Sequence, residues 1–213
     1  MPLTRLGWLT TRVPNPALAS ATGFAFLMRG NAAVFSRGFG TLCDTLRSLG
    51  VWAEDLRCVG DGWVERTILT AQQAGWGDKP SILIGHSRGG RRAICAATRL
   101  LPRGVSIDLL ICLDVAFPPV LPGNVRRAIH LFRTSHRVYP ARPLRSTDPS
   151  THVENLDLDA PDSPIPARGL HHLNITASAA VQSWIETQIR GLLTRANPAR
   201  PSRPPGPARR VNV

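Results

Sequence analysis

The fold is decided by the stretch SILIGHSRGG, which occupies residues 81–90. Its first residues, Ser81 to Ile84, are nearly all aliphatic, as is typical of a strand buried on both faces of a parallel sheet. The segment from Gly90 to Leu101 has the apolar spacing of a helix. A buried strand that runs through a tight glycine-containing turn into a helix is the repeating unit of α/β sheets.

Strands and helices alternate on both sides of this stretch. The remaining predicted strands are 24–28, 51–56, 107–113, 128–132 and 153–158, and the remaining predicted helices are 39–49, 63–74 and 175–193, with a proline-rich loop at 159–169. This order predicts an α/β fold in three layers, with helices on both faces of a mostly parallel central sheet.

The 213 residues are enough for one domain with a sizeable core. We expect an N-terminal arm at 1–22, the α/β domain at 23–195 and a disordered tail rich in proline and arginine at 196–213. The arm does not resemble a signal peptide, because Arg5, Arg12 and two prolines interrupt any apolar core. No apolar run approaches the roughly 20 residues of a membrane-spanning helix.

The formal charge of +12 invites a role in binding nucleic acid or an anionic membrane. The cations are spread along the chain, however, and Lys79 is the only lysine, so a general arginine bias explains the charge more simply. We therefore expect no specific nucleic-acid binding. The tail at 196–213 leaves open a weak contact with anionic surfaces, or a function that resides in the tail itself.

The four cysteines, Cys43, Cys58, Cys95 and Cys112, show no C-x-x-C spacing, and the last two lie in apolar segments. Buried, reduced cysteines of this kind indicate a reducing compartment, and we expect the cytoplasm. Neither the cysteines nor the histidines have the spacing of metal ligands, so no metal and no cofactor are expected.

The chemistry is concentrated at Gly85-His86-Ser87-Arg88-Gly89. A Gly-x-Ser-x-Gly segment between a buried strand and a helix predicts a nucleophile elbow. The turn would hold the Ser87 hydroxyl above the strand ends, at a helix N-terminus that favours developing negative charge. Only small residues fit at Gly85 and Gly89, where the strand and the helix approach each other.

This segment resembles the elbow of α/β-hydrolase-fold serine esterases, lipases and thioesterases. The resemblance implies a catalytic triad in the chain order serine, acid, histidine, which Ser87, Asp114 and His172 follow. Asp114 comes directly after the predicted strand 107–113. His172 has the spacing of the histidine that precedes the last helix in many members.

Two of these positions have rivals. His171 is one residue away from His172 and would be the base if the loop were arranged differently. Asp157, Asp159 and Asp162 precede the histidine loop, where many other hydrolases of this fold carry the acid.

The resemblance also implies an oxyanion hole. One donor would be the backbone N–H of Arg88, and the second would come from the loop after the first strand, around Gly30-Asn31-Ala32, with the Asn31 side chain as another possible donor. Residues expected near the mouth of the site, as an acyl or alcohol pocket, are Phe35, Ser36, Phe39 and Phe117.

The predicted function is hydrolysis of carboxylic esters or thioesters, with small-molecule or lipid-like acyl substrates, through an acyl-enzyme on Ser87. The segment between Asp114 and His172 is too short and too rich in proline for a large helical cap, so an open site is expected. The alternative is a catalytically degenerate hydrolase fold used as a binding or scaffold protein.

Overall fold

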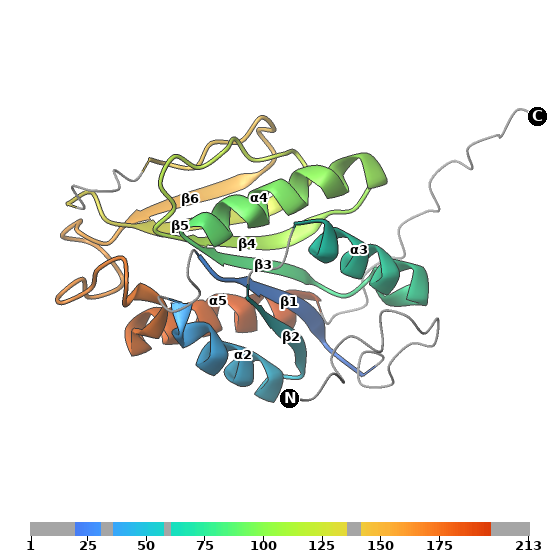
Figure 1. Cartoon of the computed structure of the whole chain (residues 1–213), viewed down its shortest axis with the longest axis horizontal. Helices are drawn as coiled ribbons and strands as arrows, with labels where there is room; N and C mark the ends of the chain where they lie inside the picture. The colour runs from blue at the N-terminus through green and yellow to red at the C-terminus, as the bar shows by residue number, and fades with distance from the viewer. Residues whose placement is uncertain (1–19, 31–35, 58–60, 136–141, 197–213) are drawn as a thin grey trace, which may run out of the picture.

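The computed structural model describes residues 20–30, 36–57, 61–135 and 142–196. Six strands form one sheet in the order β2-β1-β3-β4-β5-β6, and every neighbouring pair is parallel (Figure 1). The strands are β1 (Gly23–Met28), β2 (Val51–Leu56), β3 (Ser81–His86), β4 (Ile107–Leu113), β5 (Val125–Phe132) and β6 (His152–Asp157). The α-helices are α2 (Gly38–Ser48), α3 (Asp61–Ala71), α4 (Arg88–Leu100) and α5 (Ala179–Ala196).

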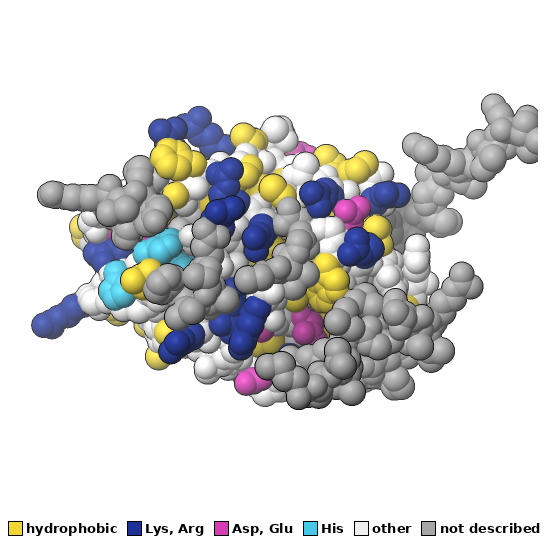
Figure 2. All heavy atoms as spheres, viewed as in Figure 1, with side chains coloured by type: hydrophobic (Ala, Val, Ile, Leu, Met, Phe, Trp, Pro, Cys, Tyr) yellow, Lys and Arg dark blue, Asp and Glu magenta, His cyan; other side chains and the backbone are white. Residues whose placement is uncertain are grey.

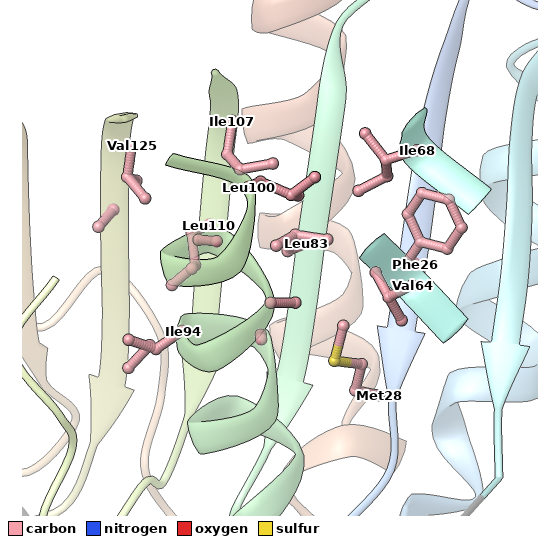
Figure 3. Close-up of a cluster of buried hydrophobic side chains, with 14 of the residues drawn as sticks. Phe26, Met28, Val64, Ile68, Leu83, Ile94, Leu100, Ile107, Leu110 and Val125 are labelled. Atoms are coloured by element: carbon pink, nitrogen blue, oxygen red, sulfur yellow. The ribbon is translucent and has the colours of Figure 1, made fainter. Parts of the chain in front are cut away.

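The alternation of side chains along each strand produces two hydrophobic cores. On one face, residues such as Phe26, Leu83 and Leu110 pack against Val64 of α3 and Ile94 of α4 (Figure 3). The opposite face packs against α2 and α5; its buried residues include Leu27, Ile84, Ile111, Leu42 and Ile185. The three-layer α/β architecture with a parallel sheet is therefore confirmed.

Two connections differ from the expected strand–helix alternation. No helix lies between β4 and β5, and none lies in the described part of the connection from β5 to β6. Loops cover this part of the sheet instead, and they contribute Leu121 and Leu144 to the core. The Asn155 side chain of β6 holds the second loop, because its amide accepts the N–H of Leu144 at 2.7 Å and donates to the Leu144 carbonyl at 3.1 Å. The described residues between Asp114 and His172 thus contain no helical cap.

The last helix begins later than residue 175, where the sequence predicted it. A short 3-10 turn, Ile175–Ala177, comes first, and Ser178 then has an extended backbone. The Ser178 hydroxyl accepts the N–H of Val181, which is the arrangement of a helix N-cap. The apolar periodicity continues across this cap, so the break could not be seen from hydrophobic spacing.

The carboxyl ends of the strands lie at one edge of the sheet, and backbone hydrogen bonds fix their relative positions. Ser87 N–H donates to the Leu113 carbonyl at 2.9 Å, and Asp114 N–H donates to the Leu131 carbonyl at 2.8 Å. The first residues after β3 and β4 are therefore held side by side.

Several expectations fall on residues outside the described ranges. They concern the predicted tail beyond Ala196, most of the predicted arm, Asn31, Phe35 and Cys58, so these expectations stay predictions. Ala196 itself is the last residue of α5. Of the cysteines that the structure describes, Cys43 and Cys112 are buried and Cys95 is half-buried, all as free thiols. Within the described ranges, no helix has the length and apolar character needed to cross a membrane.

Candidate active site

Ser87 lies in a strained turn between β3 and α4. Its backbone angles are φ 54° and ψ −123°, a conformation that residues with a side chain rarely adopt. The glycines around it permit close packing: a Cβ on Gly85 would lie 2.4 Å from the Gly90 Cα, and one on Gly89 would lie 2.0 Å from the Met28 carbonyl oxygen. The expected need for small residues on both sides of Ser87 follows directly from these contacts.

Asp114 and His172 form a buried pair beside this turn. The Asp114 Oδ2 and His172 Nδ1 atoms are 2.7 Å apart, and the two side chains are 3% and 12% exposed. Asp114 Oδ1 is buried and makes no hydrogen bond with any described residue. Since an ionised carboxylate only accepts hydrogen bonds, His172 carries its proton on Nδ1 and leaves Nε2 as the basic nitrogen.

The rival residues have other partners or lie at the surface. His171 is exposed, and its Nδ1 accepts the N–H of Leu173 within its own loop at 3.2 Å. Asp157 accepts the Thr134 hydroxyl at 2.7 Å, and Asp159 forms an ion pair with Arg133 at 2.6 Å. Asp162 is exposed. Of the candidates, the structure brings only Asp114 and His172 together.

Ser87 Oγ makes no hydrogen bond with a described residue. The nucleophile turn and the His172 loop meet at His86, the residue before Ser87, whose ring centroid lies 4.7 Å from that of His172. Nucleophile–base contacts are often loose without substrate and tighten when it binds. Ser87 is half-buried and therefore open to solvent from the carboxyl edge of the sheet.

The electrostatic surroundings of Ser87 favour negative charge. Ser87 immediately precedes α4, and Arg88 N–H, as the first of the helix, has no acceptor within it. The first turns of α4 contain Arg88, Arg91 and Arg92 and no acidic residue. These arginines lie at the positive end of the helix dipole, so they destabilise the helix slightly. They also make the electrostatic potential around Ser87 more positive. Figure 2 shows several Lys and Arg side chains, among hydrophobic ones, over α4.

The loop after β1 lies against the nucleophile turn. A Cβ on Gly30 would lie 3.2 Å from the Ser87 Cβ, which shows how closely the backbone approaches. The Gly30 N–H donates to the Ser36 Oγ at 3.2 Å and is therefore not a second oxyanion donor. Asn31, the expected donor, lies outside the described residues.

His130 supports Asp114 from the neighbouring strand. This side chain is fully buried on β5, and its Nε2 accepts the N–H of Val115 at 3.1 Å. Burial lowers the pKa of His130 to about 4, so the imidazole is neutral and can accept this hydrogen bond. The bond restrains Val115, the residue after Asp114. Asp114 itself has a positive φ of 48°.

Some exposed hydrophobic side chains follow the site residues closely in sequence. Of the large hydrophobic residues that the structure describes, those with substantial exposure are Leu101, Phe117, Val120 and Leu173. Three of them follow Asp114 or His172 closely in sequence, and Figure 2 shows histidine and hydrophobic side chains together at the left end of the molecule. Phe39, expected near this mouth, is instead fully buried in the core under α2, and Ser36 is buried against His86.

Sequence reasoning assigned no role to His86 or His130. Each is a buried imidazole in a strand that is otherwise mainly aliphatic near its end. A titratable residue at such a position is the pattern that would have marked them. No group of three or more histidine, cysteine, aspartate or glutamate residues that could hold a metal occurs within the described ranges.

No protein-family model matches this sequence, and no curated protein matches it. Among solved structures, the chain is similar to the NocB thioesterase domain from the nocardicin cluster, at 15% identity over 83% of this chain and 96% of that chain, with a TM-score of 0.48. It is similar to human thioesterase 2 at 10% identity over 84% and 99% of the two chains, with a TM-score of 0.49. It is also similar to RedJ, a thioesterase from the prodiginine pathway of Streptomyces coelicolor, at 13% identity over 90% and 99%, with a TM-score of 0.41. At identities of 10–15% and TM-scores below 0.5, these similarities carry no argument about the family or the activity of this chain.

Proposed function

We propose that this chain is a serine hydrolase that cleaves carboxylic esters or thioesters, with Ser87 as nucleophile, His172 as general base and Asp114 as the acid that orients it. The observation that carries the proposal is the position of a strained serine at a strand–helix turn beside a buried Asp114–His172 pair, with 2.7 Å between the carboxylate and Nδ1. Strained backbone at a polar, solvent-accessible turn is typical of catalytic sites.

The reaction follows from the protonation states of these groups. His172 Nε2 accepts the Ser87 proton while Oγ attacks the substrate carbonyl carbon, and Asp114 stabilises the imidazolium that forms. The carbonyl electrons move onto oxygen, which the Arg88 N–H stabilises at the positive end of α4. The tetrahedral intermediate collapses as His172 returns the proton to the leaving alcohol or thiol. Water, deprotonated by His172, then releases the acid from Ser87.

The surroundings favour an apolar acyl or alcohol group. Exposed Phe117 and Leu173 flank Asp114 and His172 in sequence, and the described residues supply no helical cap above them. An open entrance with an apolar rim suits small or lipid-like acyl substrates. Asn31, beyond the described residues, remains the proposed source of the second oxyanion donor.

The decisive experiment is labelling with a fluorophosphonate probe, followed by intact mass spectrometry. We expect one adduct on the wild-type chain, no adduct on Ser87→Ala and an at least hundredfold slower reaction for His172→Ala, because only a deprotonated serine attacks the probe at a useful rate. His171→Ala is the matched control and should react like the wild type. An active wild type would then be assayed with p-nitrophenyl esters and acyl thioesters of increasing chain length.

One observation favours a second candidate, the catalytically degenerate binding protein. Ser87 Oγ makes no hydrogen bond with His172 in this structure. Absence of an adduct on a well-folded wild type, judged by circular dichroism, would support that candidate and reject the hydrolase.

A further inference from the structure

One side chain, His86, contacts three separate parts of the candidate site. Its Nε2 lies 2.9 Å from the backbone carbonyl oxygen of His172, and its ring packs beside the His172 ring. Its Nδ1 lies 2.9 Å from the Ser36 Oγ, and that oxygen accepts the N–H of Gly30. In sequence, it directly precedes Ser87. The imidazole therefore connects the histidine loop, the loop after β1 and the nucleophile turn.

The partners determine where every proton in this chain of hydrogen bonds lies. A carbonyl oxygen can only accept, so His86 Nε2 carries the proton and donates to His172. In the neutral imidazole, Nδ1 is then an acceptor, and the Ser36 hydroxyl donates a hydrogen bond to it. Ser36 Oγ in turn accepts the Gly30 N–H. Each donor in this chain has an acceptor, and one His86 tautomer satisfies all three bonds.

The environment of His86 keeps it in the neutral form. The side chain is 1% exposed, at the end of a strand that is buried along its whole length. Burial, reinforced by the neighbouring His172, lowers the pKa of His86 to about 4. A protonated ring would have no lone pair for the Ser36 hydroxyl, so the low pKa is consistent with the hydrogen bonds that the distances indicate.

We propose that His86 is a positioning residue that holds the backbone of the general base, together with Gly30 and Ser36, in fixed places around Ser87. This inference rests on the proposed function. Fixing the His172 carbonyl fixes the start of its side chain, and thereby the direction in which Nδ1 meets Asp114. Fixing Gly30 and Ser36 holds the two residues that precede and follow the segment from which the second oxyanion donor is proposed to come. A hydrophobic residue at 86 would fill the same space and would hold neither.

Two partial replacements separate the two links. In His86→Gln, the side-chain amide nitrogen takes the place of Nε2 and can still donate to the His172 carbonyl. In His86→Asn, the shorter amide takes the place of Nδ1 and can still bond Ser36, but it does not reach His172. His86→Ala removes both links. Ile107→Val, a buried change at the opposite end of the neighbouring strand β4, is the control for a general loosening of the sheet.

The first readout is the rate of fluorophosphonate labelling at Ser87. We expect His86→Ala and His86→Asn to react roughly 10- to 100-fold more slowly than the wild type, the usual effect of removing a group that orients a catalytic residue. His86→Gln should react faster than either of these variants and within about tenfold of the wild type, since it keeps the bond to the base and loses only the bond to Ser36. Ile107→Val should not change the rate.

The second readout is the tautomer of His172, read by nitrogen-15 NMR of histidine-labelled protein. The wild type should show the proton of His172 on Nδ1, where Asp114 holds it. In His86→Ala and His86→Asn, the signal should move towards the tautomer mixture of a free imidazole. A merely structural role for His86 would not produce this change in one other histidine.

The proposal would be overturned if His86→Ala were labelled at the same rate as the wild type and its His172 kept the same tautomer. If His86→Ala does not fold, equal rates for His86→Gln and His86→Asn would overturn it, because only one of them keeps the link to His172. Failure of the proposed function looks different: the wild type would not be labelled at Ser87 at all, while the tautomer measurement would still decide whether His86 positions His172.

Discussion

Residues other than glycine with a left-handed backbone are rare, and those in the described part of the chain gather in one place. They are Ser87 at φ 54°, Asp114 at φ 48° and Phe117 at φ 48°. Such conformations cost on the order of 1–3 kcal/mol each and persist where the surrounding structure enforces them. All three follow the carboxyl ends of β3 and β4, so the strain is concentrated where the proposed chemistry takes place.

Asp114→Asn tests the orientation of the base. The amide would offer an N–H to His172 in place of a carboxylate oxygen, so the imidazole would turn to the tautomer with its proton on Nε2 and lose its basic nitrogen. We expect ester hydrolysis to fall by roughly 10⁴-fold with little change in the fold. The measurement is the hydrolysis rate with the best ester or thioester from the substrate panel.

The control is Asp159→Asn, which alters a carboxylate paired with Arg133 instead of His172. It should hydrolyse the same substrate at the wild-type rate. If the two variants were equally impaired, Asp114 would have no special role as the acid.

At the scale of elements, the packing of α4 on the sheet depends on glycine. A Cβ at Gly89 would lie 2.0 Å from the Met28 carbonyl oxygen, and backbone cannot move aside as a flexible side chain can. We expect Gly89→Ala to lower the free energy of unfolding by about 1–3 kcal/mol or more, because the helix would be pushed away from β1. Urea denaturation of both proteins measures the difference.

Gly191→Ala in α5 is the matched control. Its nearest neighbours would be Arg195 side-chain nitrogens at 3.6 Å and beyond, so the new methyl group meets no obstacle. Removing glycine from a helix interior should raise stability by roughly 0.5–1 kcal/mol. Equal effects of the two substitutions would show that close approach of α4 to β1 is unimportant.

The order of elements could be predicted because most strands are rich in apolar residues and the helices have an apolar period near 3.6, so local sequence reports burial directly. The start of the last helix, just after its cap Ser178, could not be predicted, since capping depends on a backbone change that leaves the apolar pattern intact. The packing of the loops on β5 and β6 could not be predicted either, because Leu121, Leu144 and Asn155 come together only in the folded chain. In the site, the family resemblance pointed to Asp114 and His172, whereas the contacts of His86 join segments 86 residues apart.

At the scale of the whole molecule, buried histidines couple stability to pH. His86 on β3 and His130 on β5 are neutral when folded, since burial lowers the pKa of each from 6.5 to about 4. Above pH 6.5 both residues are neutral in the folded and unfolded chains, so they add no pH dependence. Between pH 6.5 and 4 the unfolded chain binds protons that the folded chain does not, so stability falls as the pH falls.

The size of this effect is set by the pKa difference, which corresponds to on the order of 3 kcal/mol for each histidine by pH 4. Ion-paired carboxylates act in a lower range. The pKa of Asp159 is about 2, against a usual value of 3.8. Burial raises this pKa, but the hydrogen bonds from Arg133 and Ser135 lower it by more. Its contribution is lost only below about pH 4, so the window from pH 6.5 to 4.5 isolates the histidines.

Urea denaturation at pH 7.0, 5.5 and 4.5 would measure the loss, and we expect the wild type to lose a few kcal/mol across this series. His86→Gln combined with His130→Gln should remove most of the pH dependence, because glutamine does not titrate and still offers a hydrogen-bonding group at each position. His152→Gln, whose histidine is 69% exposed and already in contact with water, should keep the wild-type slope. If the stability of the wild type stayed constant over this range, His86 and His130 would become protonated without unfolding the chain. The conclusion that both imidazoles are neutral, as their hydrogen bonds with Ser36 and Val115 require, would then be wrong.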